Sequence, residues 1–297
     1  MKQKRLRVLK ILGWSVLALL LVLYVGLPTG MAIAAVWPSR AYVGEPPAGF
    51  REVPLTTEDG VELVAWYAPP NNGAVLILAH GAGGSREGGR QLATALAEYG
   101  FGVLSLDLRG HGESAGRTNR LGWLGTTDIR AAVDYITAHE GDVAIGGVGL
   151  SMGGEVLLGA SATCPEVTAI VADGATRRCT EELIALPSKR PFAENFTSRV
   201  MYGAVQLFSG ERPPTPLLDE MARSTSTRFL LIAAGNNDLE VAFNERFSDV
   251  IGARAQVWVV PDVDHVGARA RHPRAYEKRL VSFFEGALSG GSPESPE

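Results

Sequence analysis

A serine set between glycines has the clearest chemistry of any side chain in this sequence. Ser151 lies in Gly149-Leu150-Ser151-Met152-Gly153-Gly154, after the apolar segment 143–148 and before a segment with helical character, 155–160. Gly-x-Ser-x-Gly between a strand and a helix is the pattern of a nucleophile elbow, a turn so sharp that glycine is needed two residues to either side of the serine. The pattern predicts an accessible nucleophile at position 151. A glycine-rich turn with an N-capping serine is the alternative interpretation.

A serine hydroxyl needs a base to take its proton and an acid to orient that base. His265 follows the last predicted strand, and Asp238 follows the strand before it, with a predicted helix over 241–251 between them. Because the carboxyl ends of parallel strands meet at one edge of a sheet, both side chains are expected near Ser151. This spacing predicts Ser151 as nucleophile, Asp238 as acid and His265 as base. Asp173, at the end of the strand after the elbow, is the alternative acid.

Apolar segments that alternate with amphipathic ones predict the scaffold for these residues. Segments 51–57 and 61–67 read as two strands joined at Asp59-Gly60, a hairpin signal, and strands and helices then alternate up to a final helix over 273–288. Such alternation is typical of an α/β domain with a mostly parallel central sheet and helices on both faces. We therefore expect one domain of this class over residues 51–288.

The alternation breaks within residues 174–228, which contain no clear strand. Five apolar side chains in this stretch recur every four residues and predict an amphipathic helix: Phe192, Phe196, Val200, Ala204 and Phe208. We expect a helical cap over the site, spanning about 177–222, in which three rings help to bind substrate: Phe192, Phe196 and Phe208. A helix that only completes the cover of the sheet is the alternative.

These motifs together resemble those of serine hydrolases with the α/β-hydrolase fold, close to bacterial lysophospholipase-like and serine aminopeptidase-like members. The resemblance covers about residues 53–288 and rests on five short runs: 80–85, 107–114, 149–154, 235–238 and 264–265. It implies acyl transfer through an acyl-enzyme without a metal or organic cofactor. It also implies an oxyanion hole made by the backbone N–H groups of Ala82 and Met152, with His80 ordering its loop.

The N-terminal residues have the pattern of a membrane anchor. A basic segment, 1–10, precedes an uncharged run over 11–37. This run exceeds the roughly 20 residues that span a bilayer, and positive charge before it favours a cytoplasmic N-terminus. We expect a single-pass signal-anchor, a linker over 38–50 and an extracytoplasmic catalytic domain. A cleaved signal peptide is the alternative, because Ala32-Ile33-Ala34 resembles a cleavage site.

The amino-acid composition narrows the classes of protein to which this chain can belong. The 297 residues are 46% hydrophobic and 20% charged with a net charge of −4, which gives no indication of nucleic-acid binding. Cys164 and Cys179 are the only cysteines, and the sequence is compatible with one disulfide in an exported domain or with two buried thiols. Residues 289–297 are expected to be a disordered tail. Oligomeric state is left open.

The function expected from these features is that of a membrane-anchored serine hydrolase. Carboxylic esters, including lipid-derived ones, are the expected substrates, because an anchor and an aromatic cap would place an apolar pocket near lipids. A peptidase or amidase that uses the same residues is the first alternative, since one scaffold hosts many reactions. A catalytically silent hydrolase fold that binds a ligand is the second, although the nucleophile and the base are both present.

Overall fold

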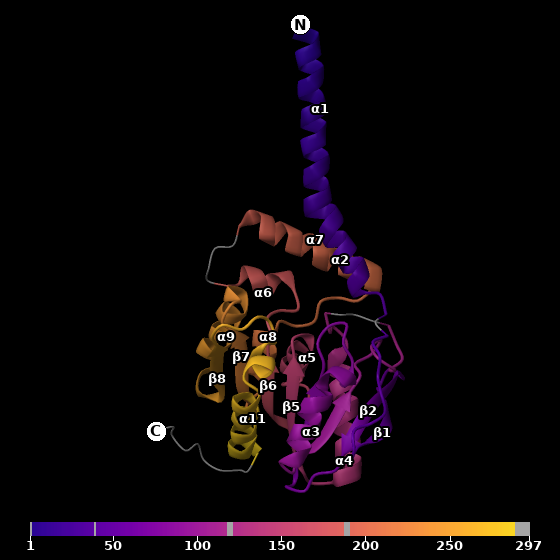
Figure 1. The fold of residues 1–297 in the computed structure, drawn as a ribbon, viewed down its shortest axis with the longest axis vertical. Helices are drawn as coiled ribbons and strands as arrows, with labels where there is room; N and C mark the ends of the chain where they lie inside the picture. The colour runs from indigo at the N-terminus through magenta and orange to yellow at the C-terminus, as the bar shows by residue number, and fades with distance from the viewer. Residues whose placement is uncertain (1, 39, 118–120, 187–190, 289–297) are drawn as a thin grey trace.

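An eight-stranded sheet forms the centre of the molecule in the computed structural model, which describes residues 2–38, 40–117, 121–186 and 191–288 (Figure 1). The strands lie in the order β1-β2-β4-β3-β5-β6-β7-β8, and all pairs from β4 onward are parallel. The pairs β1·β2 and β2·β4 are antiparallel. The strands span β1 Arg51–Thr56, β2 Glu62–Ala68, β3 Ala74–Ala79, β4 Gly102–Leu106, β5 Ala144–Leu150, β6 Val167–Asp173, β7 Arg228–Ala234 and β8 Ala255–Val260. The mostly parallel sheet predicted from the sequence is therefore confirmed.

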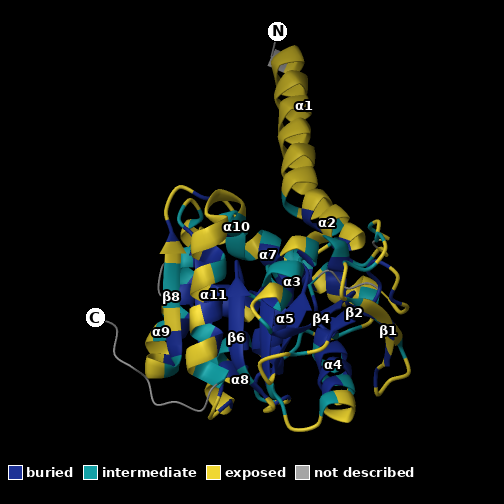
Figure 2. Ribbon diagram, turned by 60° about the horizontal axis from the view of Figure 1, so that its bottom comes forward, coloured by how far each residue is buried: buried dark blue, intermediate teal, exposed yellow. Residues whose placement is uncertain are grey.

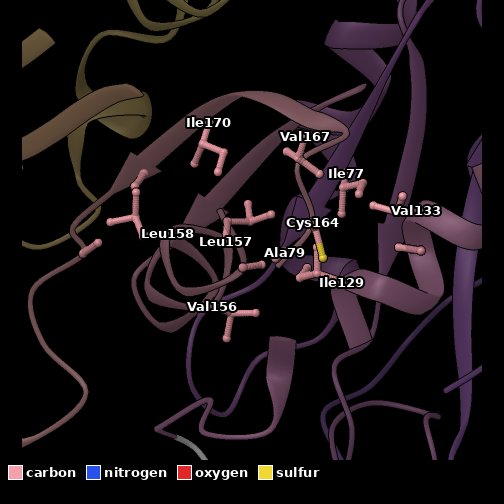
Figure 3. Close-up of a cluster of buried hydrophobic side chains, with 14 of the residues drawn as sticks. Ile77, Ala79, Ile129, Val133, Val156, Leu157, Leu158, Cys164, Val167 and Ile170 are labelled. Atoms are coloured by element: carbon pink, nitrogen blue, oxygen red, sulfur yellow. The ribbon is translucent and has the colours of Figure 1, made fainter. Parts of the chain in front are cut away.

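Helices cover both faces of this sheet, which explains why the central strands are apolar without alternation. In β3 every residue is buried: Ile77 packs into the cluster of one face, and Leu76 and Leu78 pack into the cluster of the other. Figure 3 shows part of the first cluster, where Ile77 meets side chains of the helices on that face. That face carries α4 (Gly125–Glu140), α5 (Met152–Ala160), α8 (Leu217–Arg223) and α9 (Asp238–Ile251), and the other carries α3 (Arg90–Glu98) and α11 (Pro273–Leu288).

The long N-terminal helix leaves the domain as a rod. Its successive parts are α1 (Lys2–Leu21), the π-helical turn η1 (Val22–Gly26) and α2 (Leu27–Ala35). Within it, Gln3–Ala35 is long and apolar enough to cross a membrane, and its most apolar window has no buried residue (Figure 2). The predicted N-terminal apolar helix is therefore present. The rod packs on the domain mainly through α2, where Pro28, Ala32 and Ala35 are buried, and η1 also contacts α7.

A helical insertion follows β6, where the sequence predicts a cap. It contains α6 (Thr180–Ile184), α7 (Phe192–Ser209) and α8, and α7 lies across the base of the N-terminal rod (Figure 1). The short helices η2 (Arg86–Gly89), η3 (Gly252–Arg254) and α10 (Ala268–Arg271) complete the described elements.

The segment expected to be a linker is fastened to the domain by hydrogen bonds. Arg40 Nη1 donates to the carbonyl of Ser114 at 2.5 Å, and the Gly44 N–H donates to the Glu87 carboxylate at 2.9 Å. Cys164 and Cys179 are buried and free, so they do not form a disulfide with each other. The predicted disordered tail, 289–297, lies outside the described residues.

Candidate active site

The turn from β5 into α5 holds Ser151 in a backbone conformation that is uncommon for a residue other than glycine. Its φ is 51° and its ψ is −118°. A Cβ on Gly149 would overlap the backbone of Gly153, and a Cβ on Gly153 would overlap the carbonyl of Ala79 at the end of β3. The Ser151 N–H donates to the Asp173 carbonyl at 2.6 Å, which ties the turn to β6. This is the sharp strand-to-helix turn that Gly-x-Ser-x-Gly predicts.

The imidazole of His265 lies beside this serine. Its Nε2 is 2.8 Å from Ser151 Oγ, and its Nδ1 is 2.5 Å from Oε1 of Glu240. Since a carboxylate can only accept, Nδ1 carries the proton and Nε2 is free to accept from the serine hydroxyl. The hydrogen bond to Glu240 raises the pKa of His265 above its ordinary value. Three side chains, from three different loops or helix starts, thus form one hydrogen-bonded series.

The acid in this series differs from the predicted one. Asp238 is exposed at the first position of α9, whereas Glu240 is fully buried one half-turn later. The Glu240 carboxylate also accepts from the Ala234 N–H at 3.0 Å and from Asn237 Nδ2 at 2.7 Å. The prediction of Asp238 as the partner of His265 is therefore wrong.

The helix start explains this correction. Asn237 is the N-cap of α9 and its side chain accepts from the N–H groups of Leu239 and Glu240. The helix thus begins three residues earlier than the predicted 241, and the side chain at its first position points away from the one at its third. Asn237-x-x-Glu240 has the spacing of a helix N-cap and an acidic third residue, and this signal could have identified Glu240 from the sequence.

The alternative acid, Asp173, is close to the histidine but bonds elsewhere. Its carboxylate accepts from the Tyr276 hydroxyl at 3.0 Å, and burial raises its pKa to about 7. The next residue, Gly174, lies under the imidazole: a Cβ there would be 2.9 Å from Cε1 of His265. Asp173 therefore supports the floor of the site, while Glu240 holds the ring nitrogen.

The loop after β3 runs over the elbow and is fixed by His80. Burial lowers the pKa of His80 to about 4, so its ring is neutral. Its Nε2 accepts from the Leu108 N–H at 3.1 Å, and its Nδ1 is 2.8 Å from the carbonyl of Gly81. A Cβ on Gly81 would be 3.4 Å from Cβ of Ser151, which measures how closely this loop approaches the nucleophile. These contacts agree with a loop-ordering role for His80.

The two backbone N–H groups predicted to form an oxyanion hole belong to the residues that follow Ser151 and Gly81. Met152 is the first residue of α5, where helix N–H groups have no partner within the helix. Ala82 follows Gly81 in the loop over the elbow. Their joint role in binding an oxyanion stays a prediction.

The run 107–114 builds a supporting loop. Asp107 is buried and accepts from the N–H groups of Arg86 at 2.6 Å and Glu113 at 2.9 Å, and it also pairs with the guanidinium of Arg86. The Ser114 hydroxyl donates to the Asp107 carbonyl at 2.6 Å. This buried network holds the loop that contains Leu108, the residue that orients His80.

The cap rings predicted to bind substrate lie largely on the exposed side of α7. Phe192 is 79% exposed, Phe196 36% and Phe208 47%, whereas the buried residues of α7 are Ser198, Tyr202 and Val205. The ring of Phe192 stacks on that of Phe196, one turn further along the same helix. Their predicted part in the substrate pocket is not supported by this placement.

Comparisons with known proteins identify the family and the fold of the chain. The family described as Serine aminopeptidase, S33, matches residues 70–225, which include the elbow. The uncharacterized protein YfhR of Salmonella typhi is 27% identical over 276 residues, which is 89% of this chain and 91% of that protein. The esterase Pf2001 of Pyrococcus furiosus superposes with a TM-score of 0.68 at 24% identity, covering 86% of this chain and 98% of that one.

A second solved structure extends the likeness to the whole chain. A membrane phospholipase A, described as a bacterial virulence factor, superposes with a TM-score of 0.57 at 19% identity. The match covers 98% of this chain and 100% of that one, so it includes the N-terminal helix. At these identities the two structures show that the fold is shared, and the fold is that of α/β hydrolases.

Proposed function

This chain belongs to the Serine aminopeptidase, S33, family of hydrolases, and from that premise we propose that it is a membrane-anchored serine hydrolase that cleaves carboxylic esters. The single observation that carries the proposal is the series of hydrogen bonds from Ser151 through His265 to Glu240, at 2.8 and 2.5 Å. Along the chain, Ser151, Glu240 and His265 follow one another as nucleophile, acid and base, which is the order of the α/β-hydrolase mechanism, in which the acid is Asp or Glu.

The proposed reaction begins with proton transfer from Ser151 to His265. As Oγ attacks the substrate carbonyl, Nε2 takes its proton, and the Glu240 carboxylate stabilises the imidazolium that forms. The oxyanion of the tetrahedral intermediate accepts from the N–H groups of Met152 and Ala82, each of which supplies on the order of 3 kcal/mol in comparable sites. His265 then protonates the leaving alcohol, and water, deprotonated by the same nitrogen, releases the acid from the acyl-enzyme.

Ester substrates of lipid origin are favoured by the contact between the helical cap and the N-terminal helix. The cap that follows β6 packs on α2, the part of the apolar rod nearest the domain. The structural likeness to a membrane phospholipase A over nearly the whole chain supports the same substrate class. We therefore propose an ester with an apolar acyl chain as the substrate.

Retention of the N-terminal helix as an anchor is part of the proposal. Ala32 and Ala35 are 0% and 9% exposed, in a cluster with Tyr202 and Val205 of α7. Cleavage after Ala34 would remove Ala32 and the preceding residues of α2 from this contact with α7. The basic residues before the span favour a cytoplasmic N-terminus and an extracytoplasmic catalytic domain.

A fluorophosphonate probe tests the central claim without knowledge of the substrate. We expect the full-length protein in detergent to be labelled, and Ser151→Ala to be unlabelled. His265→Ala should be labelled far more slowly, because the hydroxyl then lacks its base. An unlabelled wild type that is folded by circular dichroism, or equal labelling of the Ser151→Ala variant, would contradict a serine hydrolase at this site.

Amide hydrolysis is a second candidate, favoured by the family description as a serine aminopeptidase. Comparing kcat/KM for acyl esters with that for aminoacyl amides, at equal enzyme concentration, separates the two. We expect esters to be preferred. A clear preference for amides with a free amino group would mean that the protein is a peptidase and not an esterase.

A further inference from the structure

The cap helix α7 has two unlike faces. Toward the domain it buries Ser198, Tyr202 and Val205. Large apolar side chains remain exposed elsewhere on it: Phe192 (79%), Phe196 (36%), Leu207 (77%) and Phe208 (47%). The rings of Phe192 and Phe196 stack with their centroids 6.0 Å apart. Exposed apolar area concentrated on one helix marks an interaction surface.

The N-terminal rod determines where this surface lies. Pro28, Ala32 and Ala35 recur along one side of α2 and are buried, and two of them share a cluster with Tyr202 and Val205 of α7. Figure 1 shows α7 running across the base of the rod, which projects beyond it. Because the contact is buried, the depth of the rod in a bilayer also sets the depth of α7.

Charges along the sequence define that depth. Lys10 is the last charged residue before Arg40, so the uncharged section starts at Ile11. A helix rises about 1.5 Å per residue and the hydrocarbon of a bilayer is about 30 Å thick, so roughly 20 residues, to about position 30, fill it. The last residues of α2, and the part of α7 that packs on Ala32 and Ala35, then lie at the level of the lipid headgroups, and the part of α7 that contacts η1 lies deeper.

Aromatic residues that follow the rod also suit a position at the level of the lipid headgroups. Trp37 and Tyr42, which follow α2, are 68% and 80% exposed. Tryptophan and tyrosine collect at the interface between membrane and water. Arg199 is exposed on α7 among the apolar side chains, as a cation is when it meets lipid phosphate.

We propose that the exposed apolar side chains of α7 dock on the outer leaflet of the membrane that the N-terminal helix crosses. Phe192, Phe196 and Leu207 insert among the headgroups and α7 lies flat in the interface. The inference rests on the anchoring proposed above and adds a second contact to it. A spanning helix together with a flat helix restrains the tilt of the domain, so that the cap stays against the leaflet from which an apolar ester would come.

A fluorescent probe at defined positions tests this docking in the full-length protein. The environment-sensitive NBD fluorophore is attached to Leu207→Cys, and the protein is reconstituted into vesicles of phosphatidylcholine and phosphatidylglycerol. Leu20→Cys, near the middle of the span, reports on the anchor. Tyr99→Cys is the matched aqueous control: it is 53% exposed at the end of α3, beside the loop before β3 and thus at the sheet edge opposite Ser151. The native thiols are buried, and wild type treated with the reagent gives the background.

Quenching by iodide in water and by lipids with nitroxides at shallow or deep positions reads the environment of each probe. We expect the probe at 207 to be quenched by the shallow nitroxide and to show several-fold weaker iodide quenching than the probe at 99. The probe at 20 should respond to the deep nitroxide. Iodide quenching at 207 equal to that at 99 would overturn the docking.

The probe at 20 separates failure of the docking from failure of the anchor. If position 20 responds to the deep nitroxide while 207 remains open to iodide, the anchor stands and the docking is wrong. If position 20 is also open to iodide, the proposed anchoring fails and the docking fails with it. A probe at 207 that is shielded from both iodide and nitroxide lipids would indicate a second copy of the chain on this face, and would also overturn the proposal. Fluorophosphonate labelling of Ser151 on the same samples reports separately on the proposed chemistry.

Discussion

Glu240 and Asp238 are two positions apart, and this small separation decides which of them meets His265. Successive helical residues are rotated by about 100°, so two positions place side chains on nearly opposite sides of the helix. The expectation of an acid after β7 agrees with the structure. The identity of the acid follows only once Asn237 is recognised as the N-cap of the helix, because that cap decides which carboxylate is buried.

Neutralising each carboxyl separately tests the correction. We expect Glu240→Gln to lower kcat/KM by several orders of magnitude, up to about 10⁴-fold as for the equivalent change in serine proteases, because the amide can donate to Nδ1 and stabilise the wrong tautomer. Asp238→Asn is the matched control at an exposed position and should retain nearly full activity. The rate of hydrolysis of a soluble ester is measured for both variants. Loss of activity in Asp238→Asn with full activity in Glu240→Gln would restore Asp238 as the acid.

The pH dependence of hydrolysis follows from the same hydrogen bond. Glu240 raises the pKa of His265, so the imidazole stays protonated, and unable to act as a base, up to a higher pH than an ordinary histidine. Activity is therefore expected to fall with decreasing pH through a midpoint above about 6.5, the ordinary value. In Glu240→Gln the residual activity should show a midpoint at lower pH. A pH profile of kcat/KM gives the midpoint for wild type and for the variant. Equal midpoints would contradict the hydrogen bond between Glu240 and His265.

The buried carboxyl of Asp173 should affect stability more than catalysis. Burial raises its pKa to about 7, so its contribution to stability is full below its unfolded pKa and is lost as pH rises through 7. Asp173→Asn keeps an acceptor for Tyr276 and removes the buried charge. We expect the variant to have a higher Tm than wild type at pH 8, and the difference in Tm to be smaller at pH 5. The gain in the free energy of unfolding at pH 8 has an upper limit of about 4 kcal/mol, at roughly 1.4 kcal/mol per pKa unit.

Thermal unfolding at the two pH values makes this comparison. A variant that is less stable than wild type at pH 8 would show that the ionised carboxylate is needed in the folded protein. Loss of turnover on the scale of Glu240→Gln would mean that Asp173 shares the role of the acid.

At the scale of elements, the elbow was predictable because its glycines are required by close contacts. Gly153→Ala would place a methyl group against the carbonyl of Ala79, and the strain of overpacking is typically about 1–3 kcal/mol. Gly286→Ala is a matched control: this exposed glycine lies in α11 and an added Cβ meets no atom within 4 Å. There the change should stabilise the helix by up to about 1 kcal/mol. Urea unfolding measures both, and equal effects would contradict steric crowding at the elbow.

The cap helix was predictable as an element, but its orientation was not. Its apolar side chains recur every four residues, and four residues turn a helix by about 400°, so the repeat drifts by about 40° at each step. From Phe192 to Phe208 the repeat moves around the helix instead of following one face, which is why residues such as Val200 are only partly exposed. The partners that select the buried face are α2, η1 and α6, and the sequence of α7 alone contains no information about them.

At the scale of the whole molecule, the N-terminal helix is part of the packed structure as well as an extension of it. The predicted boundary between anchor, linker and domain is less sharp in the structure, because α2 contacts α7 and Arg40 bonds to the loop at Ser114. Contacts between segments so far apart in the chain depend on the complete fold. Periodicity and charge predict each segment by itself and do not predict such contacts.

Two truncations test whether α2 supports the cap. A chain that begins at residue 27 keeps α2 and loses most of the apolar rod, whereas a chain that begins at 36 loses α2 and uncovers Tyr202 and Val205. We expect the shorter chain to bind more of the dye ANS and to exchange the amide hydrogens of α7 faster, because a buried apolar contact has been lost. The chain from 27 keeps the contact of α2 with α7 and should exchange these hydrogens more slowly than the chain from 36. Equal exchange in the two truncations would show that the cap is stable without α2, and cleavage after Ala34 would then leave the cap intact.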